Sequence, residues 1–475
     1  MINVKKFILT QMFHIATIIF MLITFETAQL LFKIFVVSTI AAFVLYLPRI
    51  WYFVDGFKKV KQLNNPVKNR LAVLVPARNE KGVIHMMESL EKQTYSHKFF
   101  DTFIIVKDSN DPAIELCKNY TNMFSIVVPV QSCKGDALDG ALQKIMKKKK
   151  KYAGYIIVDA DNVVDENFVL EMNNSLVSDA DIILGKRCVK NYLYSKEYRN
   201  WVVNCNGLIY TFLDKLGNAF RSKHNMYCSV CGTGIMITSR LVDEIGGWPY
   251  RSVTEDYELG ITSLIAGRKF FLYEPAVTYT EESLSHKNAN DRRRRWLLGF
   301  AQVTVKYKKD VIAKYHEDKE KLKNGLSGEE LKKVRGNFWG CFDFLYSLIP
   351  LAFIFAPAAI SAIVFGAATV NSWLKFGIYD SSTIFFVKRL GVCCLYLYGI
   401  LFVYTLLGMI ADRKVLKISF LEKLLVLLIN PFYIAEYVKF FFWAFYKLAT
   451  KSEDLEWVPI ERIEDHIPAK KRLRK

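Results

Sequence analysis

Four short clusters, most of them charged, are the candidates for chemistry in this chain. In order they are Arg78-Asn79-Glu80, Asp159-Ala160-Asp161, Thr254-Glu255-Asp256 and Arg295-Trp296. Most of them stand at the end of a predicted strand or at the start of a predicted helix. Acidic side chains there can hold a metal-bound nucleotide and accept a proton. The set therefore indicates an enzyme that moves a sugar from a nucleotide to an acceptor.

The Asp159-Ala160-Asp161 cluster suits a nucleotide diphosphate. A leaving diphosphate develops negative charge, which a divalent ion neutralises. Mg²⁺ and Mn²⁺ prefer oxygen ligands and often use only one or two carboxylates besides the phosphates. The alternating spacing allows one aspartate to face the ribose and the other to bind the ion. A plain turn is the alternative, because turns are rich in aspartate.

Two further strand ends and one helix start are candidates for the nucleotide pocket. The strand Leu71 to Val75 runs into Pro76-Ala-Arg-Asn-Glu80, and the next strand ends at Lys107-Asp108. Helix capping by Asn79 is the alternative for the first of these. Lys134-Gly135-Asp136 opens a predicted helix, where a lysine beside the helix N-terminus suits a diphosphate. A simple loop is the alternative there.

The Thr254-Glu255-Asp256 cluster is the candidate for the catalytic base. An acceptor hydroxyl needs a base within hydrogen-bond reach to take its proton as it attacks the anomeric carbon. We choose Asp256 for this role, with Glu255 as its competitor. Alternatively, Thr254 is a plain N-cap and the two acids merely favour the first turn of a helix that runs to Ala266.

The run Arg292 to Arg295, followed by Trp296, has two interpretations. The first three arginines could form an interfacial patch for lipid headgroups. In the functional interpretation, Arg295 lies near the diphosphate and Trp296 stacks on a sugar ring, because arginine suits phosphate and aromatic faces suit sugar C–H surfaces. His286 is the one histidine close to this cluster.

Short apolar runs alternate with helical patterns through the middle of the chain, which predicts an α/β domain with a largely parallel sheet. Ligands on such sheets bind at the carboxyl ends of the strands, where the motifs that follow strands fall. The predicted strands are Leu71–Val75, Phe103–Val106, Ser125–Val128, Tyr155–Val158 and Asp181–Leu184, and the predicted helices include Val83–Gln93 and Gly135–Lys149.

The composition points to membrane spans at the two ends of the chain. Of the 475 residues, 52% are hydrophobic, and the apolar runs are concentrated at the ends. Phe7 to Phe25 and Leu30 to Val54 are each long enough to cross about 30 Å of hydrocarbon. Apolar stretches return at Phe338 to Val370, Leu390 to Ile410 and Phe420 to Leu448, the last interrupted at Asn430-Pro431.

The formal net charge of +19 fits a cytoplasmic face beside anionic lipid and would attract an anionic nucleotide sugar. No helix-turn-helix, RNP or zinc-finger pattern supports nucleic acid as a partner. The nine cysteines are scattered, and the single CxxC of Cys228 and Cys231 has no second pair, so we expect reduced thiols rather than zinc.

These patterns predict a multi-pass protein of the plasma membrane with a cytoplasmic catalytic domain. The predicted divisions are two N-terminal transmembrane helices at 1–57, an α/β domain at 66–310, an amphipathic or interfacial segment at 311–337, transmembrane and interfacial helices at 338–450, and a basic cytoplasmic tail at 451–475.

The order of the motifs resembles that of the processive, membrane-bound, family-2 inverting glycosyltransferases, among them hyaluronan, chitin, cellulose and poly-N-acetylglucosamine synthases. The likeness runs from about Leu71 to Val311. It rests on Pro76-Ala-Arg-Asn-Glu80, Val158-Asp-Ala-Asp-Asn162, Cys231-Gly-Thr-Gly234, Gly246-Gly-Trp248, Thr254-Glu-Asp256 and Arg295-Trp296.

This resemblance implies a GT-A fold, a single in-line displacement that inverts the anomeric carbon, and a role for each matching residue. Asp256 would be the base, and Asp161 would bind Mg²⁺ or Mn²⁺. The nucleotide of a UDP-sugar would contact Ala77, Glu80, Asp108, Lys134, Asp159 and, at the diphosphate, Arg295. The growing glycan acceptor would lie against Cys231, Gly232 and Trp296.

Two positions depart from the family pattern. The family's Gln-x-x-Arg-Trp is here Arg292-x-x-Arg-Trp, and Ser-Asn-Asp-Pro112 follows Asp108.

The resemblance implies elongation and extrusion of a β-linked extracellular polysaccharide across the lipid bilayer. The alternative is single-sugar transfer to a lipid-linked acceptor.

Overall fold

The structure is a computed structural model that describes residues 25–46, 49–58, 60–78, 80, 82–148, 150–347, 350–413 and 416–450. The first predicted span, Phe7 to Phe25, lies almost wholly outside these residues, as do Asn79 and the basic tail. The described chain forms two compact units. One comprises residues within 1–50 and 344–404, and the other comprises residues within 51–343 and 405–475.

The second unit is built on an eight-stranded sheet with the order β3-β2-β1-β4-β7-β6-β8-β5. Strands β7 and β5 run antiparallel to their neighbours, and all the other pairings are parallel. The strands are β1 Leu71–Pro76, β2 Phe100–Val106, β3 Met123–Val127, β4 Gly154–Ile157, β5 Val163–Val164, β6 Ile182–Val189, β7 Ile235–Thr238 and β8 Phe270–Thr280. The prediction of a largely parallel α/β sheet is confirmed.

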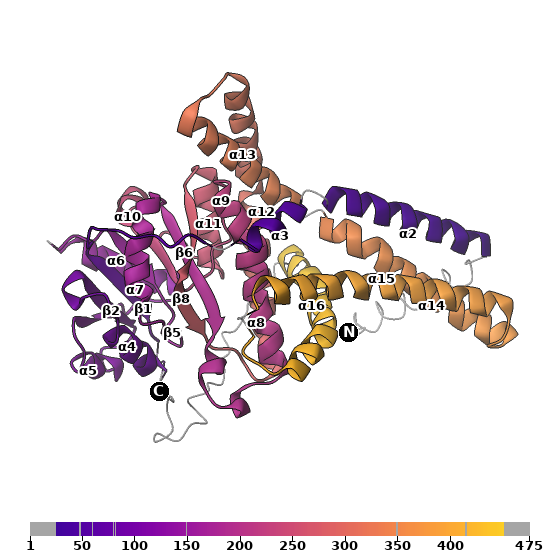
Figure 1. Cartoon of the computed structure of the whole chain (residues 1–475), viewed down its shortest axis with the longest axis horizontal. Helices are drawn as coiled ribbons and strands as arrows, with labels where there is room; N and C mark the ends of the chain where they lie inside the picture. Colours follow the sequence, from indigo (N-terminus) through magenta and orange to yellow (C-terminus); the bar gives the residue numbers. More distant parts are fainter. Residues whose placement is uncertain are drawn as a thin grey trace, which may run out of the picture. The chain divides into compact units, whose positions relative to one another are not determined.

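Helices pack around this sheet (Figure 1). The buried core lies between them and the central strands, and includes Val73, Ile104 and Phe168. The helices that flank the sheet are α4 Val83–Glu91, α5 Ala113–Cys117, α6 Lys134–Met146, α7 Phe168–Ser175, α10 Ser239–Ile245 and α11 Glu255–Ile265. Central strands are buried on both faces, which explains why their sequences are continuously apolar.

Three further elements of this unit lie between β6 and β7. Helix α8 covers Trp201–Leu213, a π-helical turn covers Asp214–Asn218, and α9 covers Ala219–Lys223. A π-turn inserts an extra residue into the helical ladder and is frequent at functional sites. The short helix α3, Ile50–Gly56, packs here through Tyr52, whose ring stacks on Phe220 at 4.1 Å.

The segment after the sheet is mostly helical. Helix α12 runs over His286–Lys323, and α13 covers Gly328–Ser347. The segment 311–337, predicted as amphipathic or interfacial, is therefore helix except at the turn between α12 and α13. Gly325 lies in that turn and Gly328 begins α13, with φ of 78° and 62°, a conformation that favours glycine.

Helix α16, Phe420–Ala449, belongs to the same unit and lies beside α8 and α12 (Figure 1). In the sequence this stretch is interrupted at Asn430-Pro431. The structure has one continuous helix with Pro431 inside it. The preceding Asn430 is fully buried, and its amide donates to Thr405 Oγ1 at 3.0 Å.

The first unit is a helical cluster of α2 Phe25–Tyr46, α14 Pro350–Phe376 and most of α15 Ser381–Ala411. Its buried residues include Phe35, Phe365 and Phe386. Arg389, inside an apolar helix, lies with its guanidinium 4.0 Å from the ring centre of Phe32, which offers the cation a favourable aromatic face.

Within the described residues, three helices are long and apolar enough to cross a membrane: Ala358–Phe376, Ser381–Ala411 and Phe420–Ala449. Two of the apolar runs each extend over two helices. The run Leu30 to Val54 includes most of α2 and part of α3. The run Phe338 to Val370 is divided between α13 and α14, and α14 begins at Pro350.

Candidate active site

Lys134 is the centre of a charged cluster in the second unit. Its Nζ donates to Asp159 Oδ1 at 2.6 Å and to the carbonyl of Gly232 at 2.6 Å, and it lies 3.6 Å from Glu255 Oε1. The opposing carboxylates raise the lysine's pKa against the effect of burial, so the ammonium stays charged. One cation thus joins the ends of β4, the Cys231-Gly232 loop and α11.

The start of α6 explains why Lys134 stands where it does. Cys133 is the N-cap, and Asp136 completes a capping box by accepting from the main chain of Cys133 at 3.2 Å. Gly135 packs so closely that a Cβ there would lie 2.0 Å from the carbonyl oxygen of Tyr250. The helix is thereby docked on the loop that follows Gly246-Gly-Trp248, and the prediction that Lys134 opens a helix is confirmed.

The carboxyl ends of three neighbouring strands supply the predicted nucleotide residues. Ala77 follows β1 and donates its N–H to Ile105 of β2 at 2.8 Å. Asp108 follows β2 and is exposed, whereas Asp159 follows β4, the other neighbour of β1. Glu80 accepts from the N–H of Gly82 at 3.1 Å. Parallel pairing therefore brings these residues to one edge of the sheet.

Glu255 and Asp256 begin helix α11, as the sequence predicted. Burial raises the pKa of Glu255 to about 7, partly opposed by Lys134. Burial also raises the pKa of Asp256, again opposed by Lys134, while its Oδ1 accepts from the N–H of Tyr257 at 2.8 Å. Thr254 stands at the N-cap but makes no side-chain capping bond, so it is not the plain cap of the alternative interpretation.

The Cys231-Gly232 loop closes over these carboxylates. A Cβ on Gly232 would lie 3.0 Å from Lys134 Nζ and 3.3 Å from Asp256 Oδ2, so this position admits only glycine without movement. Burial raises the pKa of the Cys231 thiol to about 11, which keeps it protonated and unreactive at neutral pH. All nine cysteines are free in the structure.

The loop before Cys231 is held by the π-turn. Asn218 is fully buried, accepts from the N–H of Ser229 at 2.8 Å and donates to the Ser229 carbonyl at 3.0 Å. Asp214, at the other end of the turn, pairs with Arg187 of β6 at 2.9 Å. The π-turn thus orients two polar side chains toward the segment that carries Gly232.

A second buried network supports the turn that contains Asp161. Lys190 is fully buried; its Nζ donates to the carbonyl of Asp161 at 2.7 Å and pairs with Glu281 at 3.0 Å. Thr233 Oγ1 accepts from the N–H of Asp159 at 3.0 Å and from the amide of Asn162 at 2.7 Å. The Asp-x-Asp turn is therefore fixed from both sides through its main chain.

One face of α12 points toward this region. Arg292, Trp296 and Gly299 are spaced by about one helical turn each. Gly299 lies against Thr254, because a Cβ there would come within 2.5 Å of the threonine side chain. The guanidinium of Arg292 lies 5.0 Å from the ring centre of Trp296 and pairs with the buried carboxylate of Glu282. Arg295 is partly buried on the same helix.

The opposite face of α12 binds α16, which corrects one interpretation of the arginine run. Arg293 is fully buried, lies 3.8 Å from the ring centre of Tyr433 and pairs with Glu436 at 2.8 Å. Arg292 is also largely buried, so of the first three arginines only Arg294 is exposed and available to lipid headgroups. His286 binds Glu436 at 2.9 Å, an inter-helix contact.

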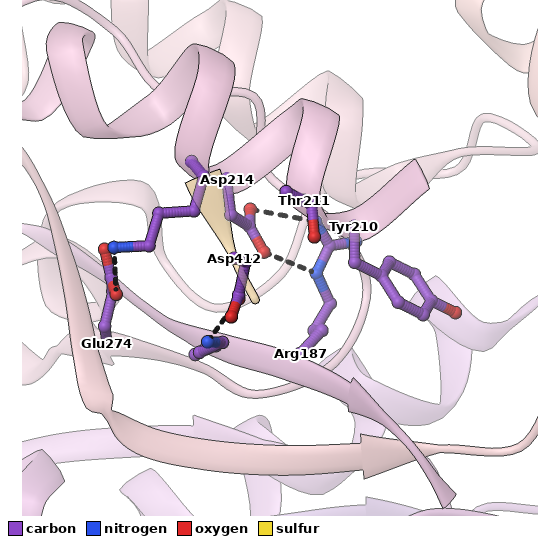
Figure 2. Close-up of a pocket in the computed structure, with 8 residues that line it drawn as sticks. Arg187, Tyr210, Thr211, Asp214, Glu274 and Asp412 are labelled. Carbon is purple, nitrogen blue, oxygen red and sulfur yellow. Dashed lines mark hydrogen bonds and ion pairs between the residues drawn. The ribbon is translucent and has the colours of Figure 1, made fainter. Parts of the chain in front are cut away.

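A small pocket lined by residues of β6, the end of α8 and the π-turn contains further ion pairs (Figure 2). Arg187 faces Asp214, while Glu274 pairs with Lys215 at 2.7 Å and Asp412 pairs with Lys186. Asp412 comes from the α15–α16 connection and Lys186 from β6. The pocket is therefore a charge-balanced contact between the sheet and this connection, and each acid has a basic partner.

The donor groups near the Asp-x-Asp turn determine how the site could hold a metal ion. Among the described residues, no group of three or more His, Cys, Asp or Glu side chains is arranged to hold an ion. Asp161 lies partly exposed in the turn after β4, at the same edge as Asp159. That arrangement fits an ion held jointly by one carboxylate and the phosphates of a bound nucleotide rather than by a protein cage.

The structure brings Lys134, Asp159, Gly232 and Asp256 into one cluster and sets Ala77, Glu80 and Asp108 along the adjacent strand ends. Sequence reasoning missed the buried supports Lys190, Asn218, Glu281 and Glu282. The adjacent acids Glu281-Glu282 directly after β8 were a visible signal, since two acids side by side at a strand end require cations if they are buried.

The sheet carries carboxylates at the carboxyl ends of its parallel strands, which is where ligands bind on sheets of this kind. The chain belongs to the glycosyl transferase family group 2, whose model matches residues 155–435, and the model of glycosyl transferase family 2 matches residues 72–237. The protein is therefore a family-2 glycosyltransferase by descent, and its sheet domain has the GT-A fold.

Similar proteins include the probable glycosyltransferase YdaM of Bacillus subtilis, 23% identical over 243 residues, which are 50% of this chain and 57% of YdaM. The bacteriophage adsorption protein B of Escherichia coli is 26% identical over 250 residues, 48% of this chain and 32% of that protein. The chain thus spans about a third to just over half of the length of these curated relatives.

Among solved structures, the mannosyltransferase PcManGT from Pyrobaculum calidifontis, in complex with GDP-Man and Mn²⁺, aligns with a TM-score of 0.48 at 15% identity. The alignment covers 78% of this chain and 99% of that one.

Proposed function

We propose that the protein transfers a sugar from a UDP-sugar to a growing glycan, with inversion of the anomeric carbon. The observation that carries this proposal is the position of the Asp256 carboxyl. It stands beside Lys134 and the Asp-x-Asp turn, at the edge of the sheet where a nucleotide is expected. Burial raises its pKa, which makes it a stronger base than an exposed aspartate.

In the proposed step, Asp256 accepts the proton of an acceptor hydroxyl while that oxygen attacks the anomeric carbon. The new C–O bond forms as the bond from the anomeric carbon to the diphosphate oxygen breaks. The nucleoside diphosphate leaves with the electron pair, opposite the incoming oxygen, which inverts the configuration. Lys134 and Arg295 supply positive charge for the departing diphosphate.

The donor would lie along the ends of β2, β1 and β4. Ala77, Glu80 and Asp108 would contact the uridine, and Asp159 the nucleotide beyond it. Asp161 would hold Mg²⁺ or Mn²⁺, which when bound supplies positive charge to the diphosphate oxygens. Asp161, which is partly exposed in the turn after β4, is our candidate for the metal ligand.

The acceptor would lie between the Cys231-Gly232 loop and Trp296. We propose that the product is a β-linked polysaccharide that is elongated and extruded at the plasma membrane, with the catalytic unit in the cytoplasm. Three long apolar helices support a membrane location. Single-sugar transfer to a lipid-linked acceptor is the second candidate, which the departure of Arg292 from the family's glutamine favours.

The test is to purify the protein in detergent and offer radiolabelled UDP-glucose, UDP-N-acetylglucosamine and UDP-galactose, each with Mn²⁺, Mg²⁺ or EDTA. Transfer with one donor and a metal ion is expected. Asp256→Asn should lower the rate at least about 10²-fold, because general base catalysis contributes about that much. Binding of UDP, measured by calorimetry, should be unchanged.

Glu255→Gln is the matched control, since it alters the neighbouring acid and retains the base. If Asp256→Asn transfers at the wild-type rate, or if Glu255→Gln is the more damaging change, the base is not Asp256. Sizing the labelled product separates a polymer from a single addition. Product extracted into organic solvent as a labelled lipid would support the second candidate.

A further inference from the structure

The strongest unexplained feature near the site is a buried carboxylate two residues beyond β8. The Glu282 side chain is completely buried. One of its oxygens accepts from the hydroxyl of Tyr210 on α8, and the other accepts from Arg292 on α12. A buried carboxylate is costly unless it is paired and hydrogen-bonded, and both conditions are met here.

The main chain of Glu282 is fixed as well. Its N–H donates to Asn191 Oδ1 at 2.8 Å, and its carbonyl accepts from Asn191 Nδ2 at 2.9 Å. The preceding Glu281 is paired with Lys190, which also donates to the Asp161 carbonyl. The carboxylate of Glu282 is therefore held in place by the same network that holds the Asp-x-Asp turn.

Arg292 is fixed by this carboxylate and in turn contacts Trp296. Its Nη2 donates to Glu282 and its Nη1 to the carbonyl of Glu281 at 3.2 Å. The guanidinium centre lies 5.0 Å from the centre of the Trp296 ring, one turn further along α12. A planar guanidinium stacks on an indole face, so the arginine restrains the ring as well as attracting it.

We propose that the Glu282–Arg292 pair positions the Trp296 indole as the surface on which the acceptor sugar stacks. This inference rests on the proposed function. Arg292 lies over one face of the partly buried indole, and we place the sugar on the other face. A neutral glutamine at position 292 would leave Glu282 without its cation, so in this chain the arginine and the buried glutamate form one unit. Arg292 and Glu282 are thus positioning residues, which act through Trp296.

The first experiment is a double-mutant cycle on acceptor binding. Arg292→Gln, Trp296→Ala and the double variant are assayed with the donor found active, using glucose, N-acetylglucosamine, cellobiose and chitobiose as acceptors. Arg292→Gln should raise the acceptor KM roughly tenfold, the scale of one buried cation–π contact. The donor KM should not change. In the Trp296→Ala background, the Arg292→Gln change should add nothing further.

The second experiment tests the pair without activity. Arg292→Gln alone should lower the thermal unfolding midpoint, because it leaves the Glu282 carboxylate buried without its cation. The double variant Glu282→Gln/Arg292→Gln should recover part of that loss. Arg294→Gln is the matched control, because Arg294 lies two residues further along α12 and is exposed. It should change neither the acceptor KM nor the midpoint.

The outcomes separate this inference from the proposed function. If Asp256→Asn abolishes transfer but Arg292→Gln leaves the acceptor KM unchanged, or if its effect adds fully to that of Trp296→Ala, only the positioning role is overturned. If no UDP-sugar is turned over, the proposed function fails and the acceptor surface fails with it. If the double variant Glu282→Gln/Arg292→Gln then still recovers part of the lost thermal stability, the Glu282–Arg292 pair has a purely structural role.

Discussion

A single lysine organises the charged groups of the candidate site. Lys134 joins Asp159, Gly232 and Glu255, residues that lie far apart in the sequence. Without it, the carboxylates of Asp159, Glu255 and Asp256 would repel one another, and burial would oppose the ionisation of Glu255 and Asp256. The pH dependence of stability therefore reports on the burial and pairing of these carboxylates.

The pH dependence of stability should carry the signature of Glu255. In the unfolded chain its carboxyl ionises near 4.5, whereas burial raises the pKa in the folded protein to about 7. Between these values the folded state binds more protons, so the free energy of unfolding falls as pH rises. Glu255→Gln cannot ionise and should lack this fall.

The measurement is the thermal unfolding midpoint of detergent-solubilised protein, wild type and Glu255→Gln, across this pH window. The stabilising effect of the variant should grow as pH rises from about 4.5 to about 7 and then level off. Glu330→Gln, on the exposed surface of α13, is the surface control. A difference that stays constant with pH would contradict the burial of the Glu255 carboxyl.

The long helix α12 links the site to the rest of its unit. One of its faces carries Arg292, Trp296 and Gly299, and its other face presents Arg293 to α16. The position of the helix is set where Gly299 meets Thr254, two residues before the proposed base. A change at that contact should therefore act on the site through the placement of the whole helix.

Gly299→Ala should lower both stability and transfer. A new Cβ would lie within 2.5 Å of the Thr254 side chain, so the two helices must separate. Overpacking of this kind costs about 1–3 kcal/mol, which exceeds the gain of up to about 1 kcal/mol from replacing a helical glycine. Thermal unfolding and the rate of transfer are the measurements.

Gly366→Ala in α14 is the matched control, since nothing lies within 4 Å of its added Cβ. It should leave the rate of transfer unchanged. If the two substitutions behave alike, α12 and the start of α11 are not in the close contact described.

For the molecule as a whole, the net positive charge and the long apolar helices indicate a location at a membrane. The net charge is +19, and three of the described helices are long and apolar enough to cross a membrane. Helix α16 is one of these three, yet it also packs on α8 and α12 of the catalytic unit. We therefore propose that the catalytic unit is held directly against the cytoplasmic side of the bilayer.

Cysteine labelling of whole cells should reveal this orientation. A cysteine at Asn324, in the turn between α12 and α13, should react with a membrane-impermeant maleimide only after lysis. A cysteine at Tyr379, which is 92% exposed between α14 and α15, should react in intact cells. The parent protein with its nine cysteines sets the background. Labelling of the Asn324 variant in intact cells would overturn the cytoplasmic placement.

Local pattern was enough to predict five of the eight strands of the sheet domain, but not β5, β7 and β8. The apolar runs at β1, β2 and β4 and the polar residues after them were recognisable because buried parallel strands are continuously apolar and end where polar chemistry begins. The start of α11 at Glu255 was likewise visible, since acids favour the first turn of a helix.

Contacts between distant parts of the chain required the tertiary structure. The pairings of Lys190 with Glu281 and of Arg292 with Glu282 join residues from different elements, and no spacing rule along the chain specifies them. The division of α12 into a face toward the site and a face toward α16 is also set by packing. Apolar length likewise could not show that α16 packs on the catalytic unit, because a buried helix and a membrane span satisfy the same hydrophobic requirement.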